Sequence, residues 1–165
     1  GLVGSEMCIR DRITIKPHLA EYIIGKYNAC ELGPIRFPDR DDLYHTVFSL
    51  TEKRPNNCPV DSGNLELVLP ERREGKSPLT FNYLGYRSVK IIEKKIETRL
   101  WAELHDLIDE NKHFYGIQYI ESVAYFMRKY AIVSISEDAL LKNYYRWREI
   151  VRQKKRRRSY QKREL

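Results

Sequence analysis

The second half of the chain carries apolar side chains at intervals of three and four residues, the period of a helix with one buried face. The pattern predicts a long core-facing helix over 88–111, and Gly116 separates it from a second helix over 117–131. A third helix is expected to begin near Ile135. Residues 87–153 are therefore predicted to be all-helical.

The first half combines shorter helical and strand patterns. Helices are predicted over 18–29 and 41–52, and acidic side chains at the start of the second favour a helix N-terminus. Short strands are predicted over 13–17, 65–70 and 79–83, because these segments are apolar or alternating and end at Pro or charged loops. The last two strands are expected to pair as a hairpin.

Together these elements predict a mainly helical α+β fold. A small antiparallel sheet with the N-terminal helices would occupy residues 13–86. A three-helix half with a helix-turn-helix-like ending would occupy 87–153. Residues 154–165 form a basic tail that is expected to be disordered on its own, because neighbouring like charges repel each other.

Residues 1–12 show neither a helical nor a strand period. The string Gly-Leu-Val-Gly-Ser-Glu-Met-Cys-Ile-Arg-Asp-Arg resembles the peptide obtained when sequencing adapter is translated at the end of an assembled read. We therefore expect this stretch to be non-native, to lie outside the fold and to replace the true N-terminus.

Charge changes the picture because it is concentrated at one end. The chain has 165 residues, 30 Lys+Arg and 23 Asp+Glu, and thus a formal net charge of +7. Residues 142–165 hold eleven Lys/Arg and two Glu, a net charge of +9, so the other 141 residues are slightly acidic. The basic character points to an anionic partner, and the C-terminus is where that partner would bind.

Composition also excludes some classes of protein. No stretch approaches eighteen apolar residues, so no membrane span is expected. Cys8, Cys30 and Cys58 are too few and too irregularly spaced for a disulfide framework or a zinc finger. A reducing compartment is the natural setting, which is the cytoplasm, or the nucleus if the source is eukaryotic.

The last helix is amphipathic. At 100° per residue, Leu140, Tyr144 and Trp147 share one side, whereas Lys142 and Arg146 lie opposite. A scaffolding helix over 117–131, a short connection and this basic helix have the layout of a helix-turn-helix. We therefore expect one side to pack and the other to face nucleic acid, double-stranded DNA more than RNA.

Two features depart from the usual helix-turn-helix. Ala131-Ile-Val-Ser stands in the turn where a Gly is common. Glu137 and Asp138 stand at the N-terminus of the presumed recognition helix, where phosphates would repel them. Contact with DNA is therefore expected from the middle and the C-terminal part of the helix. A packing helix that merely ends in a basic tail is the alternative.

The candidate binding residues are those whose side chains suit phosphates or base edges. Asn143, Arg146 and Gln153 are candidates for base readout, since Asn and Gln suit adenine and Arg suits guanine. The cations would neutralise phosphates and release counterions. The full set is Lys142, Asn143, Arg146, Arg148, Arg152, Gln153, Lys154, Lys155, Arg156, Arg157, Arg158, Lys162 and Arg163.

The segments 124–132 and 138–148 resemble the C-terminal part of a group of small uncharacterised proteins from bacterial mobile elements and phages. Members of that group end in a helix, a Tyr-x-Ile turn and a Leu-x-Lys-x-Tyr-Tyr-Arg-x-Arg helix. Ile15–Leu19 and Tyr22–Tyr27 are similar to their start. The resemblance implies a regulator of a mobile element or a phage and carries no activity.

Motifs for catalysis are weak. His105, Asp109 and His113 have the i, i+4, i+8 spacing of metal ligands, but a solvated helix face explains them better. Asp39, Glu74 and Lys76 fit the loose pattern of a metal-dependent nuclease, yet they stand in a charged loop and at a helix start. No catalytic residue, metal ligand or cofactor is therefore predicted, and the chain is expected not to be an enzyme.

A different class of function stays open. The basic tail could dock on an acidic protein or an anionic membrane, which would make the chain an interaction or assembly module. The helix over 117–131 is apolar around most of its circumference, so a homo-oligomer interface is compatible with it.

Overall fold

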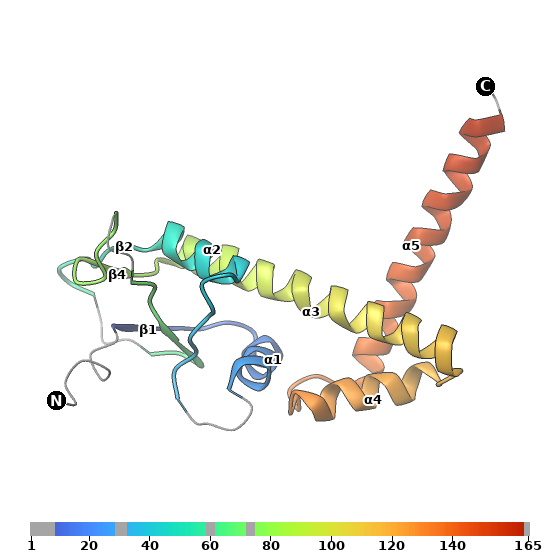
Figure 1. Ribbon diagram of the computed structural model, residues 1–165, viewed down its shortest axis with the longest axis horizontal. Helices are drawn as coiled ribbons and strands as arrows, with labels where there is room; N and C mark the ends of the chain where they lie inside the picture. The colour runs from blue at the N-terminus through green and yellow to red at the C-terminus, as the bar shows by residue number, and fades with distance from the viewer. Residues whose placement is uncertain (1–8, 29–32, 59–61, 72–74, 164–165) are drawn as a thin grey trace.

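The structure is a computed structural model that describes residues 9–28, 33–58, 62–71 and 75–163. Its described residues form a mainly helical α+β fold, as predicted. The long helix α3 (Tyr86–Tyr115) is the spine of the molecule: the strands and the two N-terminal helices lie toward its first half, and the C-terminal helices lie at its far end (Figure 1).

α3 is long because its apolar side chains form an unbroken ridge. Ile92, Ile96, Leu100, Leu104 and Ile108 are all fully buried and are spaced three or four residues apart. The helix ends where Gly116 takes a left-handed conformation (φ 64°), which lets the N–H groups of the turn bond to the last helical carbonyls. The predicted separation at Gly116 is confirmed, and the helix extends four residues beyond the predicted end.

Two short sheets, each of two antiparallel strands, lie near the N-terminal end of α3 (Figure 1). β1 (Arg10–Ile13) pairs with β3 (Leu65–Val68), and β2 (Glu52–Lys53) pairs with β4 (Phe81–Tyr83). The other side of β3 is occupied by Ile35, whose N–H donates to Glu66 and whose carbonyl accepts from Val68. The predicted hairpin between β3 and β4 is wrong, because both edges of β3 are already taken.

Residues 10–12 belong to the fold, so the prediction that residues 1–12 lie outside it is wrong for this part; residues 1–8 lie outside the described residues. Asp11 is 3% exposed and accepts a hydrogen bond from the N–H of Leu84 at 2.9 Å. Arg54 approaches the same carboxylate at 3.6 Å. A buried, bonded carboxylate ties β1 to the segment that precedes α3.

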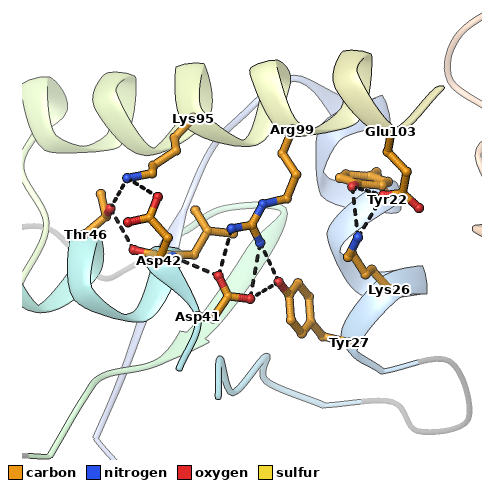
Figure 2. Close-up of polar contacts among 10 residues, drawn as sticks. Tyr22, Lys26, Tyr27, Asp41, Asp42, Thr46, Lys95, Arg99 and Glu103 are labelled. Carbon is orange, nitrogen blue, oxygen red and sulfur yellow. Dashed lines mark hydrogen bonds and ion pairs between the residues drawn. The ribbon is translucent and has the colours of Figure 1, made fainter. Parts of the chain in front are cut away.

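Two helices pack along the first half of α3. α1 (Pro17–Tyr27) begins with Pro at its first position, and α2 (Asp42–Leu50) is capped by Asp41, which accepts from the N–H of Leu43 at 2.9 Å. Arg99 of α3 donates to Asp41 at 2.8 Å and to the hydroxyl of Tyr27 at 2.7 Å (Figure 2). One guanidinium therefore joins three elements.

Two helices complete the far end. α4 (Tyr119–Lys129) packs against α3, and α5 (Glu137–Arg163) packs against α4 before it leaves the body. The C-terminal end of α5 lies far from every other element (Figure 1).

Candidate nucleic-acid interface

The first half of α5 is held by aromatic packing. Tyr144 is 1% exposed, and its hydroxyl donates to Asp109 of α3 at 2.6 Å. Burial and this hydrogen bond raise the pKa of Tyr144 well above its usual range. The ring of Trp147 stacks on His105 with centroids 4.5 Å apart, and Leu140 is fully buried. These contacts fix the direction in which the rest of α5 points.

The start of α5 is capped by Ser136, whose hydroxyl accepts from the N–H of Ala139 at 3.1 Å. Ser134, two residues earlier, instead donates to Glu21 of α1 at 2.6 Å. The exposed Glu137 and Asp138 complement the helix dipole, and Asp138 pairs with Lys142 at 2.9 Å. The N-terminus of α5 therefore presents carboxylates to solvent.

The turn between α4 and α5 has a helix-turn-helix-like feature that the sequence did not show directly. Ala131 takes φ 52°, the left-handed conformation that Gly would supply more easily. Glu21 holds the turn in place by accepting from the N–H groups of Val133 and Ser134 at 3.0 and 3.1 Å. The connection is thus clamped to α1 rather than free to move toward a groove.

The second half of α5 projects from the body and presents positive charge around its whole circumference. Residues 152–163 are exposed throughout. Eight of these twelve residues are Lys or Arg, and no acidic residue lies between Ile150 and Arg163. At 100° per residue, these eight cations point in all directions from the helix axis.

The tail is therefore helical through Arg163, and the prediction that 154–165 is disordered is wrong for 154–163. Arg, Lys and Gln are good helix formers, and α5 contains no Gly or Pro. Lys162 and Arg163 also lie in the last turn, where cations favour the helix dipole.

The structure brings most of the predicted binding residues to the surface. Asn143 is an exception: its Oδ1 lies 2.9 Å from Nε2 of His105, so its amide faces α3 rather than solvent. Arg148 is the other, because it donates to the hydroxyl of Tyr119 at 2.7 Å and is half-buried. The exposed members are Lys142, Arg146, Arg152, Gln153, Lys154, Lys155, Arg156, Arg157, Arg158, Lys162 and Arg163.

Several cations on the body of the molecule are, by contrast, paired with acids. Lys26 bonds to Glu103 at 2.7 Å, Lys95 to Asp42 at 2.6 Å, and Arg99 to Asp41 (Figure 2). An open groove of about 690 Å³ beside α3 is lined by these Lys95 and Arg99 side chains and by Lys90 and Lys94. Three of its four cations form ion pairs with acids, whereas residues 152–163 of α5 carry eight cations and no acid.

Two carboxylates of these pairs, those of Asp41 and Glu103, have lowered pKa values. Burial alone would raise the pKa of Asp41, but hydrogen bonds from Arg99, Tyr27 and the N–H of Leu43 outweigh it and hold the pKa at about 2. At Glu103, burial also raises the pKa, but hydrogen bonds from Lys26, Tyr130 and Tyr22 outweigh it and lower the pKa. Such groups connect α1, α2 and α3 and have a structural role.

The weaker catalytic patterns do not assemble. His105 is 6% exposed, so the prediction of a solvated face is wrong for this residue. Lys76 bonds to the carbonyls of Ser49 and Thr51 at 2.7 and 2.9 Å, and Glu74 lies outside the described residues. Within the described ranges, no three His, Cys, Asp or Glu side chains are grouped as metal ligands.

Two further expectations concern apolar surface. Val123 and Phe126 of α4 are covered within the chain, and the large apolar side chains that α4 leaves exposed are Ile120 and Tyr125. No helix in the described part of the chain is both long enough and apolar enough to cross a membrane.

Comparison with known proteins returned no match to a protein-family model, a curated protein or a solved structure.

Sequence reasoning missed a second cluster next to α5. Lys112 and His113, at the end of α3, lie beside Arg148 in a pocket between α3, α4 and α5. Lys112 and His113 follow Asp109 by three and four residues, so the sequence places all three on one face of α3. Only the packing of α5 against this end of the molecule brings Arg148 next to them.

Proposed function

We propose that this chain is a non-enzymatic nucleic-acid-binding protein that contacts double-stranded DNA through the projecting half of α5. One observation supports this most directly: residues 152–163 form an exposed helix with eight cations and no acid. A regulatory role in a bacterial mobile element or phage, in the cytoplasm, fits the sequence resemblance.

The dimensions of this segment suit a major groove. Twelve helical residues span about 18 Å, and the groove of B-DNA is about 12 Å wide and admits one helix. Cations on all sides of the helix can reach the phosphates on both walls. Because the N-terminal half of α5 packs on the body and starts with acids, the C-terminal half would enter the groove, unlike a standard recognition helix.

Phosphate contacts should dominate the affinity. If five to eight phosphates are neutralised, the slope of log K against log salt is expected to be about −4.5 to −7 on B-DNA. Arg146 and Gln153 are the exposed candidates for base readout, and they lie on one side of α5. Gln153→Ala is expected to change the preference among sequences if Gln153 reads adenine.

The test is fluorescence anisotropy with a duplex DNA probe at several salt concentrations. Truncation after Val151 removes the projecting half, leaves Leu140, Tyr144 and Trp147 in place, and should abolish binding. The variant Lys154→Gln with Arg157→Gln and Arg158→Gln is expected to make the slope shallower by about 3, one unit for each lost phosphate contact.

A matched control removes the same charge elsewhere. Arg87→Gln with Lys94→Gln and Arg128→Gln neutralises one Lys and two Arg that are exposed on α3 and α4. We expect it to leave the slope nearly unchanged. Equal effects of the two triple variants, or undiminished binding after truncation, would contradict the proposal.

The alternative function is docking of the same segment on an acidic protein or an anionic membrane. The positive charge of residues 152–163 favours this docking as it favours DNA binding, but docking does not require the helix to enter a groove. Sedimentation with liposomes of anionic lipid, in competition with duplex DNA, separates the two: preferential binding to liposomes would replace the proposed function by this one. Probes of single-stranded DNA and duplex RNA in the same assay identify the nucleic acid.

A further inference from the structure

A pocket of about 420 Å³ opens where α3, α4 and α5 meet, at the base of the projecting helix. It is lined mainly by polar and aromatic side chains. These are Asp109, Lys112, His113, Tyr119, Tyr144 and Arg148.

The pocket gathers cations around one aromatic ring. The guanidinium of Arg148 lies 5.5 Å from the centroid of Tyr119 and donates to its hydroxyl at 2.7 Å. The ammonium of Lys112 lies 5.6 Å from the same ring. Within the described ranges neither cation forms an ion pair. Two positive charges are therefore held close together with donors left for an anion.

The acid in the pocket does not neutralise them. Oδ1 of Asp109 accepts a hydrogen bond from the hydroxyl of Tyr144 at 2.6 Å. Part of the negative charge of Asp109 is therefore directed toward the packed side of α5. Lys112 and Arg148 outnumber Asp109, and the exposed imidazole of His113 adds a hydrogen-bond donor. A phosphate group, with its several acceptor oxygens, matches this set.

The charge of the pocket continues onto the projecting helix. Arg148, Arg152 and Lys155 are spaced by four and three residues and fall within about 60° of one another around α5. Consecutive members of the row are about 4.5–6 Å apart along the axis. A strand whose phosphate sits in the pocket can therefore place its next phosphates along this row.

Two exposed aromatic rings contact residues that line the pocket. Phe114 is 70% exposed, and its ring packs on His113 with centroids 4.9 Å apart. Tyr145 is 47% exposed, and its ring contacts that of Tyr119 with centroids 6.0 Å apart. An exposed phenylalanine beside His113 suits an unpaired base, because bases stack on aromatic rings.

We propose that this pocket binds one unpaired nucleotide of the strand that α5 holds, with the phosphate on Lys112, His113 and Arg148 and the base against Phe114. The inference rests on the proposed function and adds a substrate class to it. The preferred ligand is a duplex with a single-stranded extension, rather than a blunt duplex.

The experiment compares a blunt DNA duplex with the same duplex carrying a four-nucleotide extension at either the 3′ or the 5′ end. Anisotropy titrations with the full chain should show about tenfold tighter binding to one of the two extended probes, the effect of stacking one base. The variant Lys112→Gln with Phe114→Ser should remove this preference and keep the affinity for the blunt duplex within about twofold. Both side chains are exposed, so the fold should be unaffected.

The matched control changes one Lys and one exposed aromatic at the opposite end of α3. Lys94→Gln with Tyr86→Ser, where Tyr86 is 76% exposed, should preserve the preference. Equal affinity of the full chain for blunt and extended probes, or a preference that survives Lys112→Gln with Phe114→Ser, would overturn the pocket and leave the function of α5 standing. Failure of the full chain to bind any probe would instead refute the proposed function.

Discussion

The two halves of α5 form one continuous helix but are stabilised in different ways. Residues 137–151 are fixed by burial: Leu140 and Tyr144 pack against α3 and α4, and Trp147 stacks on His105. Residues 152–163 touch no other element and are exposed throughout. Only intrinsic helix propensity and the helix dipole hold this second half in shape.

The difference shows how a small protein can present charge. Eight cations in twelve residues repel each other, which opposes a compact arrangement. Anchoring one end of the helix in an aromatic cluster lets the charged end extend away from the body. An anionic ligand would then meet a partly ordered helix, so binding would require less ordering than binding by a disordered tail.

The largest effect is expected from the packed half. Tyr144→Ala removes a buried ring and its hydrogen bond to Asp109, and should lower the free energy of unfolding by about 3–5 kcal/mol. Urea unfolding followed by circular dichroism measures it. Tyr160→Ala in the projecting half, where the side chain is 70% exposed, is the control and should change stability by less than about 0.5 kcal/mol. Similar losses for the two variants would contradict the distinction between the halves.

A smaller effect is expected at the start of α5. Ser136→Ala removes the hydroxyl that accepts from Ala139 and should lower the free energy of unfolding by about 1 kcal/mol. Chemical denaturation of the full chain measures this loss. Ser134→Ala is the comparison. Because Ser134 bonds to Glu21, this change should affect the clamp on α1 and leave the amide of Ala139 protected from hydrogen exchange.

The helical half of the fold could be predicted because its signal is local. The ridge of α3 and the stop at Gly116 need only a helical period and one residue that tolerates positive φ. The pairing of β4 with β2 could not be predicted, since it depends on Ile35 and β1 occupying β3. Strand partners are set by tertiary packing, which the alternation of side chains within one strand does not contain.

The candidate site was predictable to a similar extent. The density of positive charge located the exposed cations of α5. The helical wheel, however, assumes one packing surface, whereas α5 packs on two helices and therefore buries a wider arc. The wider buried arc takes in Asn143 and Arg148, which were predicted to contact nucleic acid. The meeting of Lys112 with Arg148 across two helices has no signal in the sequence.

The pH dependence of the packed half follows from His105. Burial lowers the pKa of His105 and outweighs the bond to Asn143 and the charges of Asp109 and Asp106, which raise it. The unfolded chain therefore takes up this proton at a higher pH than the folded protein does. The stability that the neutral imidazole contributes is complete above a pH of about 6.5 and is lost as the pH falls below it.

We expect urea midpoints to fall between pH 7.5 and 5.5 by more in the wild type than in His105→Phe, which keeps a ring against Trp147 but cannot titrate. The difference should be smaller than the effect of Ser136→Ala, because burial and the nearby carboxylates act in opposite directions. Identical pH dependence of the two proteins would show that His105 does not couple the docking of α5 to pH.

The smallest change in global stability is expected from Arg156→Gly in the projecting half. A glycine in an exposed helix interior disfavours the local helix by about 1 kcal/mol relative to good helix formers, so the helical signal at 222 nm should decrease. The unfolding midpoint should stay within error, because residues 152–163 make no contact that is lost when the core unfolds. Added duplex DNA should restore the helical signal if the segment binds as a helix. A lowered midpoint without DNA would mean that the projecting half is packed against something in solution, for which a second copy of the chain is the first candidate, and a sedimentation experiment would then detect the dimer.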